Sequence, residues 1–294
     1  NAYKWIVIAS FIVFLAFYYR YCLDKLNLPV SRLGAVITIA SNGLFWEHKD
    51  LILSYNTFMM FTFAALVLME RLTYAEMEMR RRLVLASLTG FCIYLAYGTR
   101  SVGLVLIPTL IAADLIRLKF RSISLPTIVA LVVFGVCYVI QNIYIDVDKS
   151  YISNMNTYMV GHASDSPSRD FFTLVSAYLV STSHNVVTNL EKYAIVIWRY
   201  WGNDFGKIAQ AVMFLLTGLF AFVGLIARLR NKNIIGELFL VFYISLLLVI
   251  PFYQDQFLYV VIPLYAMYIF IGLEHVLSTR TFIGKGNVPG LLSL

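Results

Sequence analysis

The sequence predicts an all-α integral membrane protein, a multi-pass helical bundle of about nine transmembrane segments with one long extracytoplasmic loop. Three observations support this fold class. The 294 residues are 60% hydrophobic and 13% charged, whereas soluble domains carry about 25% charged residues. The mean hydropathy is +0.78, and the apolar residues form runs that suit a bilayer. The cations gather between alternate runs. We expect a single domain over 1–276, followed by a C-terminal tail over 277–294.

Nine apolar segments emerge when the chain is read with a window of about 17–25 residues. The second, fourth and fifth are short, so they are extended, broken or paired as re-entrant hairpins. The segments are Tyr3–Leu23, Leu33–Phe45, Leu51–Met69, Leu83–Gly98, Ser101–Ile116, Ile123–Ile145, Ile208–Ala227, Ile234–Phe252 and Phe257–Val276.

The cations assign the two faces of the predicted bundle. If the segments simply alternate, one face receives 15 of the 23 lysines and arginines and the other receives 8. Five of those 8 fall in one long connection, where the positive-inside rule carries little weight. We therefore expect the 15-cation face to be cytoplasmic, in a plasma or inner membrane, and the active face to be extracytoplasmic.

The long connection, 146–207, is predicted to be extracytoplasmic. Its apolar character is interrupted, which favours an outer loop with one or two interfacial helices, or else a cryptic membrane pair. His184, Arg199, Trp201 and Asp204 in this loop could contact a ligand, although such aromatic residues often mark the membrane interface.

Several functional classes are disfavoured by the sequence. The chain is basic, with a pI of about 9.2, but its cations form no stripe or tail, so nucleic acid is not an expected partner. The three cysteines lie in apolar segments and the four histidines are scattered, so the spacing indicates neither a disulfide framework nor a metal site. No cofactor motif is evident.

Arg100 stands in an apolar run, YLAYGTRSVGLVLIP over 94–108. A guanidinium at the bilayer centre costs about 2.5–3.5 kcal/mol on insertion scales, and an outer turn between two short helices would lower that cost. There Arg100 either anchors a helix end by snorkelling or clamps a lipid phosphate through bidentate hydrogen bonds. Gly98 and Gly103 would let the backbone approach such a ligand.

Two other short outer stretches carry polar side chains. In the first, Glu47 and Asp50 flank His48 and Lys49 at an expected helix start, where acidic residues also complement the helix dipole. Either carboxylate could act as a catalytic base, bind a substrate hydroxyl or help hold a divalent cation. The second stretch contains Tyr253, Gln254 and Gln256, beside Asp255. These three residues are candidate substrate-binding residues, and so are His48, Lys49 and Arg100.

Three stretches resemble, in order, landmarks of the GT-C class of membrane glycosyltransferases. ASNGLFWEHKDLILSYNTFMMFTFAALVLMER resembles the third and fourth helices of that class, and TRSVGLVLIPTLIAADL resembles its next landmark, an arginine followed by Gly-Leu and Pro. IPFYQDQFLYVVIPLYAMYIFIGLEHV resembles a late helix. The resemblance covers about residues 5 to 275. The chain departs from it at Tyr55, where an acidic residue is frequent, and at Gln256, where an arginine is frequent.

The resemblance implies sugar transfer from a polyprenyl- or dolichyl-phosphate carrier to a glycan, lipid or protein acceptor, as in mannosyltransferases and aminoarabinose transferases. It also implies a catalytic carboxylate in the first outer loop. Because Asn1–Leu23 resembles a later helix, we expect the first helix and that carboxylate to lie upstream of Asn1. Membrane lipids are the other expected partners.

Two alternatives stay open. A transporter or flippase for lipid-linked saccharides should have paired charges within its helices and repeat symmetry, and the sequence indicates neither. A non-catalytic member of the glycosyltransferase fold would fit the departures at Tyr55 and Gln256.

Overall fold

The computed structural model describes residues 2–42, 45, 55–144, 186, 207–230, 233–249 and 255–285, and within them the regular structure is helical. Six helices of this described part are long and apolar enough to cross a membrane. The predicted class, a helical integral membrane protein, is therefore confirmed. The six helices are α1 (Ala2–Leu23), α4 (Tyr55–Tyr74), α5 (Met79–Thr99), α7 (Leu125–Tyr144), α10 (Lys207–Leu229) and α12 (Val261–Lys285).

Shorter elements complete the described bundle. Helix α2 (Pro29–Ala40) begins at a proline, whose fixed φ suits the first helical position and whose missing N–H is not needed there. The 3₁₀ turn η1 (Ser101–Val105) leads into the short helix α6 (Leu106–Arg117), and η2 (Asp255–Val260) leads into α12. Helix α11 (Ile235–Val249) is apolar but shorter than the six long helices.

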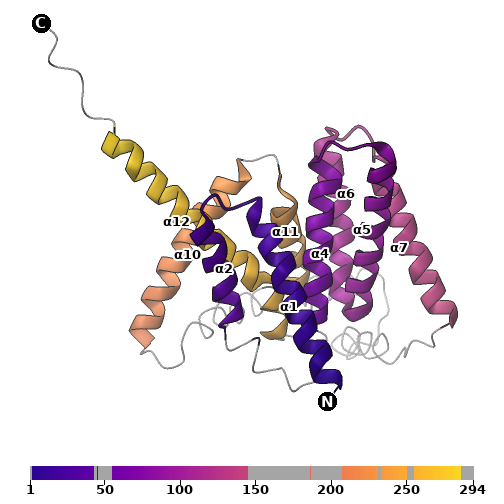
Figure 1. The fold of residues 1–294 in the computed structure, drawn as a ribbon, viewed down its shortest axis with the longest axis horizontal. Coiled ribbons are helices and arrows are strands. Elements are labelled where there is room, and N and C mark those ends of the chain that lie inside the picture. Colours follow the sequence, from indigo (N-terminus) through magenta and orange to yellow (C-terminus); the bar gives the residue numbers. More distant parts are fainter. Residues whose placement is uncertain are drawn as a thin grey trace, which may run out of the picture.

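The helices run up and down, so the connections gather at two ends (Figure 1). The turns α1–α2, α4–α5, α6–α7 and α10–α11 lie together at one end, which we call the basic end. The turn from α5 to η1 lies at the opposite end, which we call the Arg100 end. The described cations at the basic end are Arg20, Lys25, Arg32, Arg71, Arg80, Arg81, Arg82, Arg117, Lys119, Arg121, Arg228 and Arg230.

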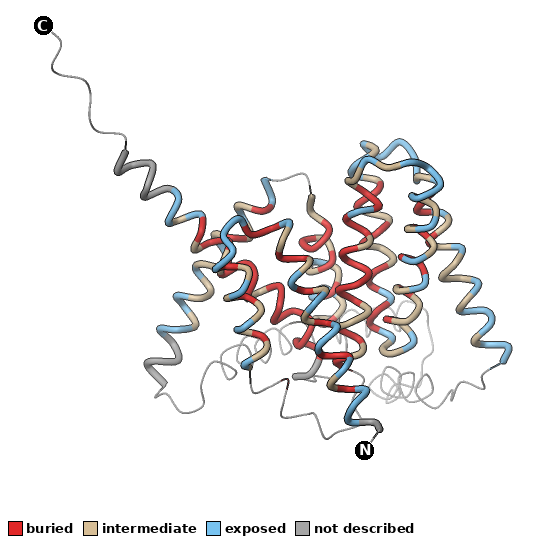
Figure 2. The backbone as a smooth tube through the Cα atoms, viewed as in Figure 1, coloured by how far each residue is buried: buried red, intermediate tan, exposed pale blue. Residues whose placement is uncertain are grey.

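Helices α4 and α12 form the interior of the bundle, and α7 and α10 form its outer surface (Figure 2). Within the apolar window of each helix, 67% of α4 and 78% of α12 are buried, against 11% of α7 and 17% of α10. The exposed side chains of α7 and α10 include Val132, Val136, Leu215 and Leu219. These outer faces are apolar, as a lipid-facing surface requires.

Two features hold the interior together. Phe14, Tyr18 and Tyr21 on α1 pack around Phe63 on α4, with ring centroids 5.2–5.9 Å apart, and the Tyr18 hydroxyl donates to the Pro263 carbonyl of α12 at 2.8 Å. Glycines allow α10 and α12 to cross closely. A Cβ at Gly224 would collide with the carbonyl oxygen of Tyr268, and one at Gly272 with that of Phe220.

Several segment boundaries differ from the expected ones. The fourth segment, predicted over 83–98, is part of the longer helix Met79–Thr99, whose first turn also includes the arginines at 80–82. The second and fifth segments are short, as expected. The C-terminal tail expected from 277 is helical as far as Lys285. The predicted loop over 146–207 lies outside the described residues, apart from Val186 and the first residue of α10.

Candidate functional site

A tight turn at the Arg100 end sets the backbone of Arg100. Helix α5 ends at Thr99, and Arg100 is extended, with φ −154° and ψ 129°. Its N–H donates to the Ala96 carbonyl at 3.0 Å, and its carbonyl accepts from the Gly103 N–H at 2.8 Å. A Cβ at Gly103 would lie 2.6 Å from the Ala96 carbonyl carbon. Gly103 therefore lets η1 fold against the end of α5, a role different from the expected approach to a ligand.

The guanidinium of Arg100 lies among aromatic rings. Its central carbon is 3.3 Å from the ring centroid of Tyr55 and 5.7 Å from that of Phe257. Tyr55 is the first residue of α4 and Phe257 lies in η2. The face of an aromatic ring attracts a cation by about 0.5–2 kcal/mol, more where water is excluded. These two rings thus stabilise the guanidinium at the end of the bundle.

A third aromatic residue connects the same elements. The ring of Tyr259, in η2, lies 5.2 Å from the ring of Tyr55 and 5.7 Å from that of Phe45. Tyr55, Phe257 and Tyr259 are buried. The cluster brings together three parts of the chain that are distant in the sequence. Phe45 and Tyr55 come from the start of α4 and the residues before it, Arg100 from the end of α5, and Phe257 and Tyr259 from η2.

Among the predicted site residues, Arg100 is the one whose side chain lies in the described part of the structure. Gln256 lies on η2, beside Phe257, but its side chain is outside the described set. The other predicted residues lie outside the described residues; they are Glu47, His48, Lys49, Asp50, Tyr253 and Gln254, together with His184, Arg199, Trp201 and Asp204 in the long connection.

A second polar cluster lies at the basic end, which the sequence predicted to be the cytoplasmic face. Lys25, after α1, forms an ion pair with Glu70 of α4. Arg228 of α10 donates through Nε to Glu237 of α11 at 3.3 Å and through Nη2 to the Asn233 carbonyl at 2.6 Å. The Tyr268 hydroxyl of α12 donates to the same Glu237 at 3.2 Å. The Lys25–Glu70 pair and the Tyr268–Glu237 hydrogen bond join parts of the chain that are distant in sequence, whereas Arg228 and Glu237 lie on consecutive helices.

The expectation that charges do not pair within the helices is therefore wrong at the basic end. Lys25, Glu70, Arg228 and Glu237 are all buried, at 4–7% exposure. Burial lowers the pKa of Lys25 from its ordinary value, and the neighbouring Glu70 opposes this shift. Glu70 and Glu237 are isolated acids in apolar helices. That placement was the signal that could have revealed the cluster, because such acids need a buried partner.

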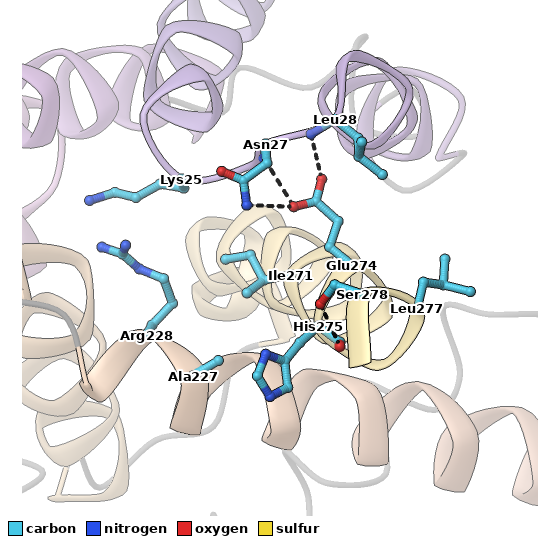
Figure 3. A pocket seen from close by; sticks show the side chains of 10 residues that line it. All are labelled: Lys25, Asn27, Leu28, Ala227, Arg228, Ile271, Glu274, His275, Leu277 and Ser278. Atoms are coloured by element: carbon cyan, nitrogen blue, oxygen red, sulfur yellow. Dashed lines mark hydrogen bonds between the residues drawn. The ribbon is translucent and has the colours of Figure 1, made fainter. Parts of the chain in front are cut away.

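A third acid, Glu274 of α12, accepts hydrogen bonds from the backbone just before the start of α2. Its carboxylate accepts hydrogen bonds from the backbone N–H groups of Asn27, at 3.0 Å, and Leu28, at 2.8 Å. The amide of the Asn27 side chain donates to it at 3.4 Å. A pocket of about 510 Å³ opens beside this contact, between the α1–α2 turn, α10 and α12 (Figure 3).

No group of three or more His, Cys, Asp or Glu side chains among the described residues is arranged to hold a metal ion. In comparisons with known proteins, no family model, curated protein or solved structure matches the chain.

Proposed function

We propose that the protein is a membrane glycosyltransferase, which transfers a sugar from a polyprenyl-phosphate carrier to an acceptor on the non-cytoplasmic face of a bundle of nine membrane segments. One observation carries the proposal. Arg100, Tyr55 and Phe257, which come from three distant stretches, meet at the end of the bundle opposite the cation-rich connections. By the positive-inside rule this end faces away from the cytoplasm.

The arrangement of the guanidinium suits a lipid phosphate. An aromatic ring contacts the face of the guanidinium plane, whereas hydrogen bonds to phosphate oxygens use the N–H groups at its edge. The Tyr55 ring, whose centroid lies 3.3 Å from the central carbon of the guanidinium, holds Arg100 at this end and brings no negative charge of its own. Arg100 directly follows α5, at the level where a lipid headgroup meets the membrane surface.

The proposed reaction is a displacement at the anomeric carbon of the sugar. A base removes the proton of the acceptor hydroxyl, the oxygen attacks the anomeric carbon, and the bond to the carrier phosphate breaks. Arg100 stabilises the negative charge of the departing phosphate. Glu47 or Asp50 assists the carboxylate that activates the acceptor, which the family resemblance assigns to a loop near the first helix. Tyr253, Gln254 and Gln256 contact the substrates.

A transporter for lipid-linked saccharides is the second candidate, because the buried ion pairs Lys25–Glu70 and Arg228–Glu237 are of a kind that such proteins use. Both pairs lie at the basic end, away from Arg100, which leaves the glycosyltransferase as the better account of the Arg100 end. A non-catalytic member of the fold would bind the carrier without transfer.

The test measures transfer of radiolabelled sugar from polyprenyl phosphate in membranes containing the full chain. We expect transfer by the wild type, a loss of about 100-fold in Arg100→Ala and a partial loss in Arg100→Lys. Arg121→Ala, at the basic end, is the matched control. Unchanged transfer in Arg100→Ala would exclude the phosphate clamp. Movement of the intact lipid-linked sugar across proteoliposomes, without transfer, would favour the transporter, and binding alone would favour the non-catalytic protein.

A further inference from the structure

The turn between α6 and α7 holds two side chains in an unfavourable backbone conformation. Lys119 and Phe120 have φ values of 52° and 59°, and they are the non-glycine residues of the described chain whose φ is positive. Their N–H groups donate to the carbonyls of Ile116, at 3.2 Å, and Leu115, at 2.7 Å. This hydrogen-bond pattern ends many helices, usually with glycine at the position of Lys119. Because glycine would avoid the Cβ penalty, the lysine and the phenylalanine are retained here at a conformational cost.

The ring of Phe120 is displayed at the surface. In this type of helix end, the residue at the position of Phe120 commonly packs against the one at the position of Leu115. Phe120 is 74% exposed, so most of its ring has no partner within the described part of the molecule. Packing inside the protein therefore does not explain the phenylalanine, whereas an apolar surrounding outside the protein would.

Positive charge surrounds this ring. The α4–α5 and α6–α7 turns lie together at the basic end (Figure 1), and Arg82 and Arg117 are close enough for their charges to interact. Residues 71–82 and 114–125 contain seven lysines and arginines but three acids, a net charge of +4. The exposed cations that form no ion pair within the described residues include Arg80, Arg81, Arg117 and Lys119.

The acids near the ring do not neutralise these cations. Asp114 is 2% exposed, and its carboxylate accepts a hydrogen bond from the Ser124 N–H at 2.6 Å. Glu76 and Glu78 are exposed, but neither forms an ion pair within the part of the chain that the structure describes. The two turns thus present unpaired cations beside an exposed ring, which is the combination that an amphipathic anion requires.

The depth of the turn indicates which anion this is. Two candidate membrane spans begin at Met79 and Leu125, directly after the two turns, and both residues are about half exposed. Phe120 lies five positions before Leu125. At this level an aromatic ring sits between the headgroups and the acyl chains of a bilayer, while lysine and arginine side chains reach the phosphates. A small soluble anion would gain nothing from the apolar residues of this surface.

We infer that Lys119 and Phe120, together with Arg80, Arg81 and Arg117, bind an anionic membrane lipid of the leaflet at the basic end. The cations contact the phosphate of the headgroup, and the ring of Phe120 inserts among the first methylenes of the acyl chains. This surface is separate from the proposed sugar-transfer site at the Arg100 end and does not depend on it.

Native mass spectrometry of the full chain in detergent tests the charged part of the surface, with dioleoyl phosphatidylglycerol and dioleoyl phosphatidylcholine as probes. Arg117→Gln combined with Lys119→Gln should reduce the preference for phosphatidylglycerol roughly 20-fold, because each cation near an anionic lipid contributes about fivefold. The matched control is Arg20→Gln combined with Arg230→Gln, which removes the same charge from exposed positions of the same end and should retain the preference.

A substitution of the aromatic residue separates binding from stability. Phe120→Gly removes a side chain from a positive-φ position, so the temperature of thermal unfolding should not fall. Both lipids should nevertheless bind several-fold more weakly, because the apolar contact is lost. If Phe120→Gly lowered the unfolding temperature and left lipid binding unchanged, the ring would serve the fold, and the inference would be overturned.

Quenching of fluorescence tests whether the ring is in the membrane. Phe120→Trp adds a fluorophore at the turn, and phosphatidylglycerol vesicles with brominated acyl chains should quench the fluorescence that the substitution adds to the wild-type signal. Absence of this quenching would assign the surface to a soluble partner and overturn the assignment to a lipid. An unchanged lipid preference in the Arg117 and Lys119 variant, or an equal loss in its matched control, would overturn the cation site.

Discussion

The central carbon of the Arg100 guanidinium lies 3.3 Å from the ring centroid of Tyr55. These residues lie at the open ends of one antiparallel helix pair, since Tyr55 begins α4 and Arg100 follows α5. A carboxylate in place of Tyr55 would form an ion pair with Arg100, whereas a ring orients the guanidinium without neutralising it. An aromatic residue at this position is thus compatible with an anion site.

A double-mutant cycle of Tyr55→Leu and Arg100→Ala measures this contact. We expect a coupling free energy of about 0.5–2 kcal/mol in the unfolding of the detergent-solubilised protein. Tyr55→Phe retains the ring face and should retain most of the stability. A coupling of zero would mean that ring and guanidinium do not stabilise one another.

The pair of Lys25 and Glu70 provides a second prediction. Glu70→Gln leaves the buried ammonium of Lys25 without its counter-charge, so the free energy of unfolding should fall by about 3–5 kcal/mol. The double variant Lys25→Met with Glu70→Leu removes both charges and should recover most of this loss. Unfolding in a denaturing detergent series measures both effects.

The matched control for this pair is Arg20→Ala. Arg20 pairs with Asp24 at 3.2 Å, but their side chains are 37% and 50% exposed. Solvent screening limits such surface pairs to about 0–1 kcal/mol. If Arg20→Ala destabilised the protein as much as Glu70→Gln, burial would not be the reason for the larger effect.

The α10–α12 crossing leads to a third prediction. Gly224→Ala places a methyl group against the Tyr268 carbonyl, so we expect a loss of about 1–3 kcal/mol in unfolding free energy. Gly135→Ala, on α7, is the control, because a Cβ there has no atom within 4 Å and alanine favours the helix by about 1 kcal/mol. Equal effects at the two positions would argue against close packing of α10 and α12.

Glu274 leads to a fourth prediction. Glu274→Ala removes the acceptor of two backbone N–H groups at the start of α2, which should cost about 1–3 kcal/mol. Hydrogen exchange at the Asn27 and Leu28 amides should accelerate. Glu274→Gln retains one carbonyl acceptor and should have an intermediate effect. Unchanged exchange in Glu274→Ala would show that the carboxylate does not hold this helix end.

Much of the helical arrangement could be predicted, because long apolar runs have to satisfy their backbone hydrogen bonds internally in a bilayer. Each of the nine predicted apolar segments overlaps a described helix. The boundaries were less accurate. The fourth segment was predicted to begin at Leu83, which left the arginines at 80–82 in a loop. They belong to helix α5, because a helix end that reaches the membrane surface tolerates charged residues.

The sequence by itself determined the helical membrane class and the gathering of cations at one end, since both follow from local composition. Only the tertiary structure decided which charges are buried and which stretches meet. Lys25 and Glu70 are 45 positions apart in the sequence, and Arg100 contacts aromatic residues from two distant segments. Helical periodicity reports the environment of one segment, whereas contacts between segments depend on how all of the helices pack.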